Sequence, residues 1–369
     1  MKIYFHIKST FRERQWDTVR HLPPDLEAIL PDNTAPIGSP QKHLLVEHEL
    51  QHRSLKRRIL KTFPLLNLRL VPKKAEKADL LYHWGSFPVF SSKPFVVEFD
   101  NPYCVSFYDR KSSQLYRPLI LHYLKKAQKL VCMSEACKKH LLEVYGETFD
   151  DKTLVQYPFM GSQKFVPLER RGPLQLLFIG LQFRLKGGPE LLQAFEGLPD
   201  QNVRLTVISF VPPEIKARYA KDSRIKFINP VSRQELINQY FPISDILGLP
   251  TLYESFGMVV LEALSFGLGI ISTDIYAMKE MVRDNINGRL LTHPIEADLK
   301  SGESSLQEYQ RTHLSGTPLF SGFGENMRDA ISLAGEQVSS WKSASRSIFQ
   351  EKFSEKIWKT RFKSLVREY

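Results

Sequence analysis

Residues 250–274 read PTLYESFGMVVLEALSFGLGIISTD and place two carboxylates, Glu254 and Glu262, around a strongly apolar block. The apolar run 245–249 predicts a buried strand that ends at Pro250, followed by a loop at its carboxyl end. Residues 257–266 then predict a helix, and residues 269–272 predict the next strand. An unpaired carboxylate is costly to bury, so the two acids face either solvent or a ligand.

Strand-like and helix-like runs alternate along both halves of the chain. The predicted strands are residues 3–7, 80–82, 95–99 and 130–133 in the first half, and 174–180, 203–208, 225–228, 245–249 and 269–272 in the second. Ser232 and Glu235 have the capping-box spacing that opens a helix over 233–241. The alternation predicts two α/β domains with parallel sheets, residues 1–165 and 166–335, that face each other across a cleft. Residues 336–369 predict a helical segment that crosses back to the N-terminal domain.

The 369-residue chain has a formal net charge of +11, and most of the surplus lies in its first half. Residues 1–165 contain 26 Lys and Arg against 17 Asp and Glu, whereas residues 166–369 contain 25 against 23. A basic surface favours phosphate-bearing partners such as anionic lipid, a phosphorylated substrate or nucleic acid, although solvated surface charge explains it equally well. Nucleic acid is not expected, because the basic residues lack interleaved aromatics or a known module.

The cysteines and the apolar runs bear on the cellular compartment. Cys104, Cys132 and Cys137 have no metal-site spacing and predict neither a disulfide framework nor a zinc site. The first residues read as a strand rather than a signal peptide, and no apolar run reaches about 18 residues. We therefore expect a cytoplasmic protein, with peripheral association at the inner face of the membrane as an open alternative.

The loop after strand 174–180 reads LQFRLKGG and contains Arg184 and Lys186. It leads into a predicted helix at the carboxyl end of a strand, and its glycines let backbone approach a ligand. Cationic side chains beside a helix N-terminus suit a diphosphate. A solvated loop with ordinary charges is the alternative.

Residues 250–274 supply further groups that suit a nucleotide-sugar ligand. Glu254 lies in the loop, and the backbone N–H groups of Phe256, Gly257 and Met258 lie at the helix N-terminus, where anions are favoured. Glu262 lies further along the helix with its side chain leaning back toward the start, where it could accept hydrogen bonds from ribose hydroxyls. Together these residues indicate a nucleotide-sugar site.

The sequence LPTLYESFGMVVLEALSFGLGIISTD, followed by EMVRDNINGRLL, resembles the donor-binding signature of glycosyltransferase family 4. The segment LLFIG…KGG…LLQAF resembles the phosphate loop of the same family, and the resemblance covers roughly residues 170–295. It implies the GT-B fold of two Rossmann-like domains. It also implies a sugar donor of UDP or GDP type, retention of configuration, and no metal or cofactor.

The same resemblance implies roles for individual residues. Arg184 and Lys186 would neutralise the leaving diphosphate together with Gly257 and Met258; Glu254, Ser255 and Phe256 would contact the donor sugar; and Glu262 would bind the ribose. Two departures stand out. Leu181 follows Gly180 where many members have Arg, and the segment after the first strand, KSTFRERQW, lacks glycine.

The first half offers further candidates. Glu98 and Asp100 share one side of strand 95–99, and Asp100 matches the position of a family histidine that faces the donor sugar. We predict that Asp100 acts with Glu254 as a catalytic carboxylate, with a metal-binding E-x-D pair or a structural acid as alternatives. His83 ends a strand and is a candidate cleft residue together with Glu98, with core packing as the alternative for the histidine.

HELQH (48–52) matches a zinc-protease motif. The basic run RSLKRRILK that follows indicates instead a polar helix face, which either contacts anionic headgroups or a phosphorylated acceptor or is simply solvated.

The expected function is a metal-independent, retaining hexosyltransferase that uses a nucleotide-sugar donor. A glycan or lipid-linked acceptor in the synthesis of a cell-surface polysaccharide, such as lipopolysaccharide, is the expected recipient. A GT-B epimerase or synthase and a non-catalytic nucleotide- or glycan-binding protein are the alternatives.

Overall fold

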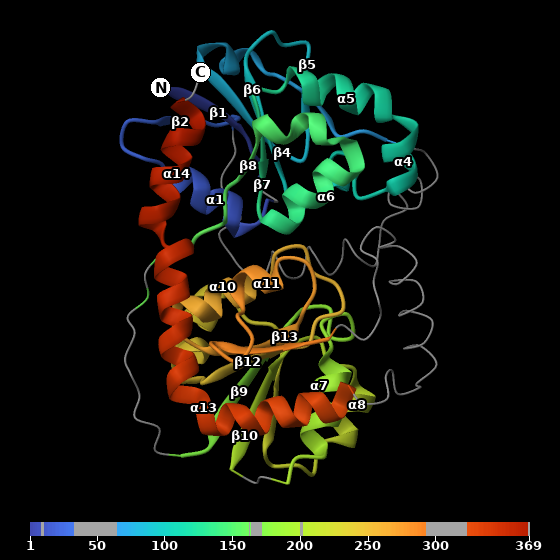
Figure 1. Cartoon of the computed structure of the whole chain (residues 1–369), viewed down its shortest axis with the longest axis vertical. Coiled ribbons are helices and arrows are strands. Elements are labelled where there is room, and N and C mark those ends of the chain that lie inside the picture. Colours follow the sequence, from blue (N-terminus) through green and yellow to red (C-terminus); the bar gives the residue numbers. More distant parts are fainter. Residues whose placement is uncertain are drawn as a thin grey trace. The chain divides into compact units, whose positions relative to one another are not determined.

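The computed structural model describes residues 1–8, 11–32, 65–161, 163, 172–199, 202–292 and 323–367. The chain forms two compact units, which Figure 1 shows in the colours of the sequence. Unit 1 comprises Met1–Pro158 and Glu355–Tyr369, and unit 2 comprises Phe159–Ser354. The boundary thus precedes the predicted one at residue 165. The predicted C-terminal segment is divided, since its last helix returns to the N-terminal unit as expected.

Unit 1 contains a parallel six-stranded sheet in the order β2-β1-β4-β6-β7-β8. Its strands are β1 (Lys2–His6), β2 (Glu27–Ile29), β4 (Leu80–Trp84), β6 (Phe95–Phe99), β7 (Lys129–Cys132) and β8 (Thr153–Val155). A separate parallel pair joins β3 (Leu68–Leu70) to β5 (Phe87–Val89). The order reverses between β1 and β4, so their carboxyl ends form the topological switch point of this sheet.

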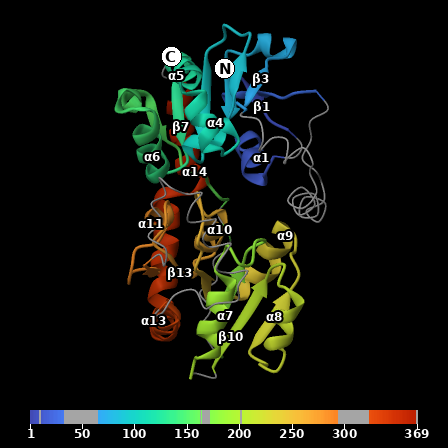
Figure 2. The same ribbon diagram turned by 90° about the vertical axis from the view of Figure 1, so that its right-hand side faces the viewer.

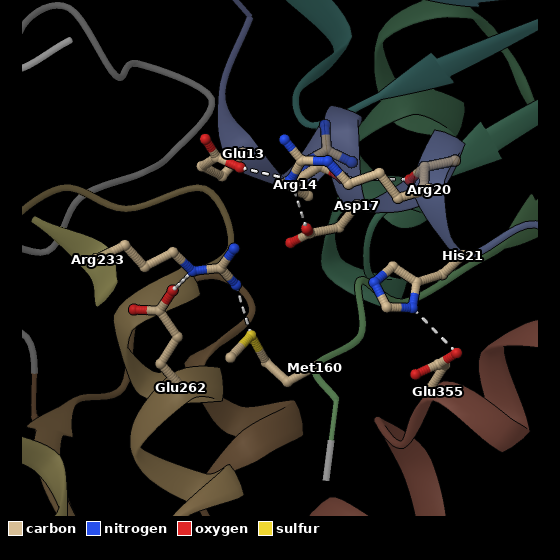
Figure 3. A network of polar contacts seen from close by, with 10 residues as sticks. Glu13, Arg14, Asp17, Arg20, His21, Met160, Arg233, Glu262 and Glu355 are labelled. Carbon is tan, nitrogen blue, oxygen red and sulfur yellow. Dashed lines mark hydrogen bonds and ion pairs between the residues drawn. The ribbon is translucent and has the colours of Figure 1, made fainter. Parts of the chain in front are cut away.

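The helices of unit 1 cover both faces of the sheet. They are α1 (Glu13–Arg20), α4 (Arg110–Leu115), α5 (Arg117–Lys126), α6 (Glu135–Tyr145) and α14 (Glu355–Arg367). Figure 1 shows α1 and α14 on one side and α5 and α6 on the other, as right-handed crossovers in opposite directions from the switch point require. Phe362 of α14 packs against Tyr82 with 5.7 Å between the ring centroids. His21 Nδ1 lies 3.0 Å from Glu355 Oε1 (Figure 3).

Unit 2 contains a second parallel six-stranded sheet, in the order β11-β10-β9-β12-β13-β14. Its strands are β9 (Leu174–Ile179), β10 (Val203–Ile208), β11 (Ile225–Ile228), β12 (Ile246–Leu249), β13 (Gly269–Thr273) and β14 (Gly288–Leu291). The switch point lies between β9 and β12. The predicted strands of both halves are therefore present, and the two Rossmann-like units confirm the predicted fold class.

The helices of unit 2 are α7 (Gly188–Glu196), α8 (Pro213–Arg218), α9 (Arg233–Glu235), α10 (Met258–Ser265), α11 (Met278–Met281) and α13 (Phe323–Lys352). α13 packs against α7, α10 and β13 (Figure 2) and buries Trp341 completely. Among the described helices, none has both the length and the apolar character needed to cross a bilayer.

Candidate functional site

The candidate site lies where β9 and β12 end in unit 2, because the loops that follow these two strands are bound together. Leu252 N donates a hydrogen bond to Leu185 O at 3.0 Å. Gly187 has φ +75°, and a Cβ atom there would lie 1.9 Å from Pro250 O. Only glycine permits both this conformation and this approach. Gly187 therefore holds the two loops in contact.

Lys186 and Glu254 come together in this contact. Lys186 Nζ donates to Glu254 Oε2 at 2.7 Å and to the carbonyl oxygen of Tyr253 at 2.8 Å. Both side chains are largely shielded, with exposed fractions of 18% and 17%. Glu254 Oε1 also accepts a hydrogen bond from Ser255 N at 3.1 Å. The two residues that the sequence assigned to diphosphate and sugar thus form one ion pair at the switch point.

Helix α10 begins directly after this loop. Gly257 is its N-cap residue, with φ +90°. A Cβ there would lie 2.3 Å from Cε of Met278, so the tight entry into the helix depends on glycine. Phe256 is buried and its ring packs against Phe353 at 6.4 Å between centroids. Its side chain is part of the core, and only its backbone lies at the helix N-terminus.

Glu262, the predicted ribose ligand, is paired with a residue that sequence reasoning missed. Arg233 Nε donates to Glu262 Oε1 at 2.7 Å, and Arg233 Nη2 lies 2.7 Å from Met160 Sδ (Figure 3). Glu262 is 8% exposed. Ser232 Oγ accepts from Glu235 N at 3.0 Å, which is the N-cap half of the predicted capping box. This cap begins the helical turn that contains Arg233. The Ser232 and Glu235 spacing was the only feature of the sequence that indicated this turn.

Arg184 forms an ion pair with the neighbouring helix α8. Its Nη2 lies 3.7 Å from Oε1 of the exposed Glu214 of α8. The role of Arg184 at the diphosphate stays a prediction.

In unit 1, the two acids near the end of β6 have different environments. Asp100 follows the strand and accepts a hydrogen bond from Tyr108 Oη at 2.7 Å. Glu98 is 5% exposed and accepts from Arg14 Nη1, from Tyr82 Oη at 2.5 Å and from Trp84 Nε1 at 3.1 Å. Since three donors already bind this carboxylate, the geometry favours the structural interpretation of Glu98 over a metal or acceptor ligand.

His83 is fully buried at the end of β4, and its Nδ1 lies 3.2 Å from Ser86 Oγ. The HELQH and RSLKRRILK segments lie outside the described residues. The described residues contain no group of three or more His, Cys, Asp or Glu placed to hold a metal ion.

Residues 161–303 match the family model described as Glycosyl transferases group 1. The matched segment lies within unit 2. The resemblance that the sequence indicated is thereby confirmed at the level of this family, and the glutamate pair, Lys186 and the glycine at 187 all lie within the matched segment.

Curated relatives share part of the chain. A D-inositol 3-phosphate glycosyltransferase from Xylanimonas cellulosilytica is 32% identical over 125 residues, which are 31% of this chain and 30% of that protein. The protein of the same name from Mycolicibacterium smegmatis is 25% identical over 189 residues, 47% of this chain and 41% of the relative. The matches thus span less than half the length of these relatives.

Solved structures share the whole fold. The Anabaena protein HepE in complex with UDP-glucose superimposes with a TM-score of 0.66 at 14% identity, over 100% of both chains. The lipopolysaccharide outer core galactosyltransferase WaaB superimposes with a TM-score of 0.61 at 14% identity, over 99% of each chain. The predicted GT-B fold is confirmed.

Proposed function

We propose that the chain is a retaining glycosyltransferase that moves a hexose from a UDP- or GDP-type donor to a glycan or lipid-linked acceptor in cell-surface polysaccharide synthesis. The observation that carries the proposal is the Lys186–Glu254 ion pair at the switch point of unit 2, next to the start of α10. In open α/β sheets, nucleotides bind at this position. Support also comes from the family match and from the UDP-glucose that the fold neighbour HepE holds.

The diphosphate would lie at Lys186 and the N-terminus of α10. The partial positive charge of a helix N-terminus and a nearby ammonium group both stabilise the negative charge that develops as the nucleotide leaves. The phosphate oxygens would compete with Glu254 for Lys186 and free that carboxylate to accept hydrogen bonds from the sugar. The proposed reaction requires no metal and no cofactor, because these groups supply the electrostatic stabilisation.

The ribose would lie at Glu262. Its carboxylate is held by Arg233 through one oxygen, so its orientation is fixed before a nucleotide arrives. Vicinal hydroxyls donate hydrogen bonds well to a carboxylate in a fixed orientation. Asp100 in unit 1 remains our proposed second catalytic carboxylate, with Tyr108 as its present donor.

Nucleotide binding tests the proposal first. We expect UDP or GDP to raise the melting temperature of the wild-type chain, and Glu262→Ala to lose most of this shift. Glu235→Ala, which removes a carboxylate from the neighbouring helix α9, is the matched control and should retain it. If neither nucleotide nor any of their sugars stabilises the wild type, the proposal is wrong. Nucleotide binding without transfer to any acceptor would favour a binding protein, and interconversion of the donor sugar itself would favour an epimerase.

A lipid-linked acceptor would bring the chain to a membrane surface. Unit 1 exposes apolar side chains around α4 and α5, namely Phe107 (45% exposed), Leu115 (62%) and Leu119 (38%). Arg110, Lys111 and Arg117 lie on the same two helices. Apolar side chains interspersed with basic ones favour an anionic lipid surface.

A vesicle flotation assay tests this membrane proposal. We expect binding to vesicles with anionic lipid and a several-fold loss in a Leu115→Ser, Leu119→Ser double variant. Leu70→Ser, which changes a 70% exposed leucine on β3, should bind like the wild type. Equal binding by all three proteins would contradict a role for this surface.

A further inference from the structure

Two histidines stack at the switch point of the unit 1 sheet. His6 ends β1 and His83 lies near the end of β4, and the two are register partners in the parallel pair. Their rings are parallel within 1°, with 5.1 Å between centroids. The carboxyl ends of β1 and β4 are also where the strand order reverses, which is the place where open α/β sheets bind ligands.

Three of the four ring nitrogens of this pair have no hydrogen-bond partner among the described residues. Both nitrogens of His6 and Nε2 of His83 are shielded from solvent and form no hydrogen bond within the described part of the chain. Ser86 Oγ satisfies only Nδ1 of His83. Buried polar atoms are almost always paired, and an unpaired one costs free energy. A neutral imidazole carries one N–H donor, so His6 offers one donor to a ligand, and His83 offers a second from Nε2 when Ser86 Oγ donates to its Nδ1.

Two cations, Lys8 and Arg69, act electrostatically on the histidines. Burial, with the charges of Arg69 and Lys8, lowers the pKa of His6 to about 4, and burial, His6 and Arg69 lower the pKa of His83 well below its usual value. Lys8 and Arg69 have no ion-pair partner among the described residues. Other cations of unit 1 do form ion pairs, for example Arg14 with Glu98 and Lys74 with Asp32.

We propose that the cluster formed by His6, Lys8, Arg69 and His83 is a binding site for a phosphate group of the acceptor. A phosphate carries up to two negative charges, which match the charges of Lys8 and Arg69, and its oxygens accept from the imidazole N–H groups. Arg69 can bind two of these oxygens at once. The assignment to the acceptor rests on the proposed function, since the donor diphosphate has its own site in unit 2. Phosphate binding itself does not rest on it.

Calorimetry with the full chain tests binding, with inorganic phosphate and glycerol 1-phosphate as probes and glycerol as the phosphate-free comparison. We expect both phosphates to bind and glycerol not to bind. Arg69→Gln and Lys8→Gln should each weaken phosphate binding about tenfold, because each removes a charge-assisted contact. Lys73→Gln, which removes an exposed charge from the same unit, should change it less than twofold. Absence of phosphate binding, or equal binding by all variants, would overturn the site.

A second experiment measures the pKa of His6 directly. A bound dianion offsets the charges of Lys8 and Arg69, so the pKa of His6 should rise from about 4 when phosphate binds. An NMR titration of the ring protons measures this rise. An unchanged His6 titration in saturating phosphate would place the anion elsewhere and overturn the proposal.

Binding of UDP distinguishes a site for the acceptor phosphate from a site for the donor diphosphate. We expect UDP to bind Arg69→Gln as well as it binds the wild type, and phosphate to bind Glu262→Ala as well as the wild type. If UDP binding requires Arg69, the cluster belongs to the donor and the acceptor assignment is wrong. If neither UDP nor GDP binds the wild type while phosphate binds through Arg69, the proposed function fails and the phosphate site stands.

Discussion

Lys186 is the residue whose charge the proposed reaction needs most. Lys186→Ala removes the ammonium group that would stabilise the leaving diphosphate and leaves Glu254 without its cation. We expect turnover in a sugar-transfer assay to fall by about 10²- to 10³-fold. Lys216→Ala, on α8, is the control, because the contact that Lys216 makes with Asn229 among the described residues is exposed. A Lys186→Ala variant with half the wild-type turnover would contradict the assigned role.

Arg233 is expected to act through Glu262. Without Arg233 the Glu262 carboxylate loses the donor that fixes its orientation, so Arg233→Ala should weaken UDP binding by about five- to tenfold. Residues that act through one contact are not additive, and the double variant with Glu262→Ala should bind UDP no more weakly than Glu262→Ala alone. Additive losses, measured by calorimetry, would show that Arg233 contacts the nucleotide independently. Arg218→Ala on α8 controls for loss of a cation.

His6 should make the stability of unit 1 depend on pH. Its pKa is about 4 in the folded chain against 6.5 ordinarily. The unfolded chain therefore binds this proton first as the pH falls, and the folded state loses stability between about pH 6.5 and pH 4. We expect a loss on the order of 1–2 kcal/mol from His6 by about pH 4.5, after allowance for its partial exposure. Hydrogen exchange in β1 at pH 7 and pH 4.5 measures the difference.

The comparison that isolates this effect is between two histidine variants. His6→Asn should show a smaller loss of stability over the same pH range than the wild type. His122→Asn, which changes an exposed histidine on α5, should show the same loss as the wild type. Equal losses in all three proteins would remove His6 as the cause.

Residues within one segment could be predicted from the sequence, whereas partners across segments could not. Glu254, Gly257 and Glu262 follow one strand and open one helix, so their spacing alone placed them together. The pairing of Arg233 with Glu262 joins positions 29 residues apart. That of His6 with His83 depends on strand register, which no local pattern encodes.

At the scale of elements, long apolar strands were predictable and short ones were not. β1, β4, β6, β9 and β10 contain five or six residues each and stand out as apolar runs. β2, β3, β5 and β8 contain three residues each, too few for a period to show. Their place is fixed by pairing with neighbours, as Lys2 pairs with Glu27, rather than by their own composition.

α14 is an element whose packing should stabilise unit 1. Phe362 is 1% exposed and stacks on Trp358 with 4.8 Å between centroids as well as contacting Tyr82. Truncating a buried aromatic leaves a cavity, so Phe362→Ala should destabilise unit 1 by about 3–5 kcal/mol. Hydrogen exchange should show faster opening of β4, with β9 of unit 2 unchanged. Thr360→Ala, at an exposed position of the same helix, is the control, and equal effects of the two variants would contradict the packing argument.

At the scale of the whole molecule, unit 2 is one uninterrupted stretch of chain and unit 1 is not. The stretch begins at Phe159 and ends at Ser354. Its two ends are joined, since Met160 forms an isolated bridge with Ser354 and Met160 N donates to Phe353 O at 3.3 Å. A sequence pattern locates a helix such as α14 but does not say which unit it joins, because that depends on contacts more than 200 residues away, such as Gln156 with Trp358.

The meeting of these two ends makes unit 2 an exchangeable cassette. A domain whose first and last residues are neighbours can be replaced by a homologous domain without distorting the unit into which it is inserted. A glycosyl transferases group 1 domain with a different nucleotide preference could therefore be spliced in between Pro158 and Glu355. Under the proposed function, such chimaeras would combine one acceptor-binding unit with many donors, which gives a modular route to new sugar linkages.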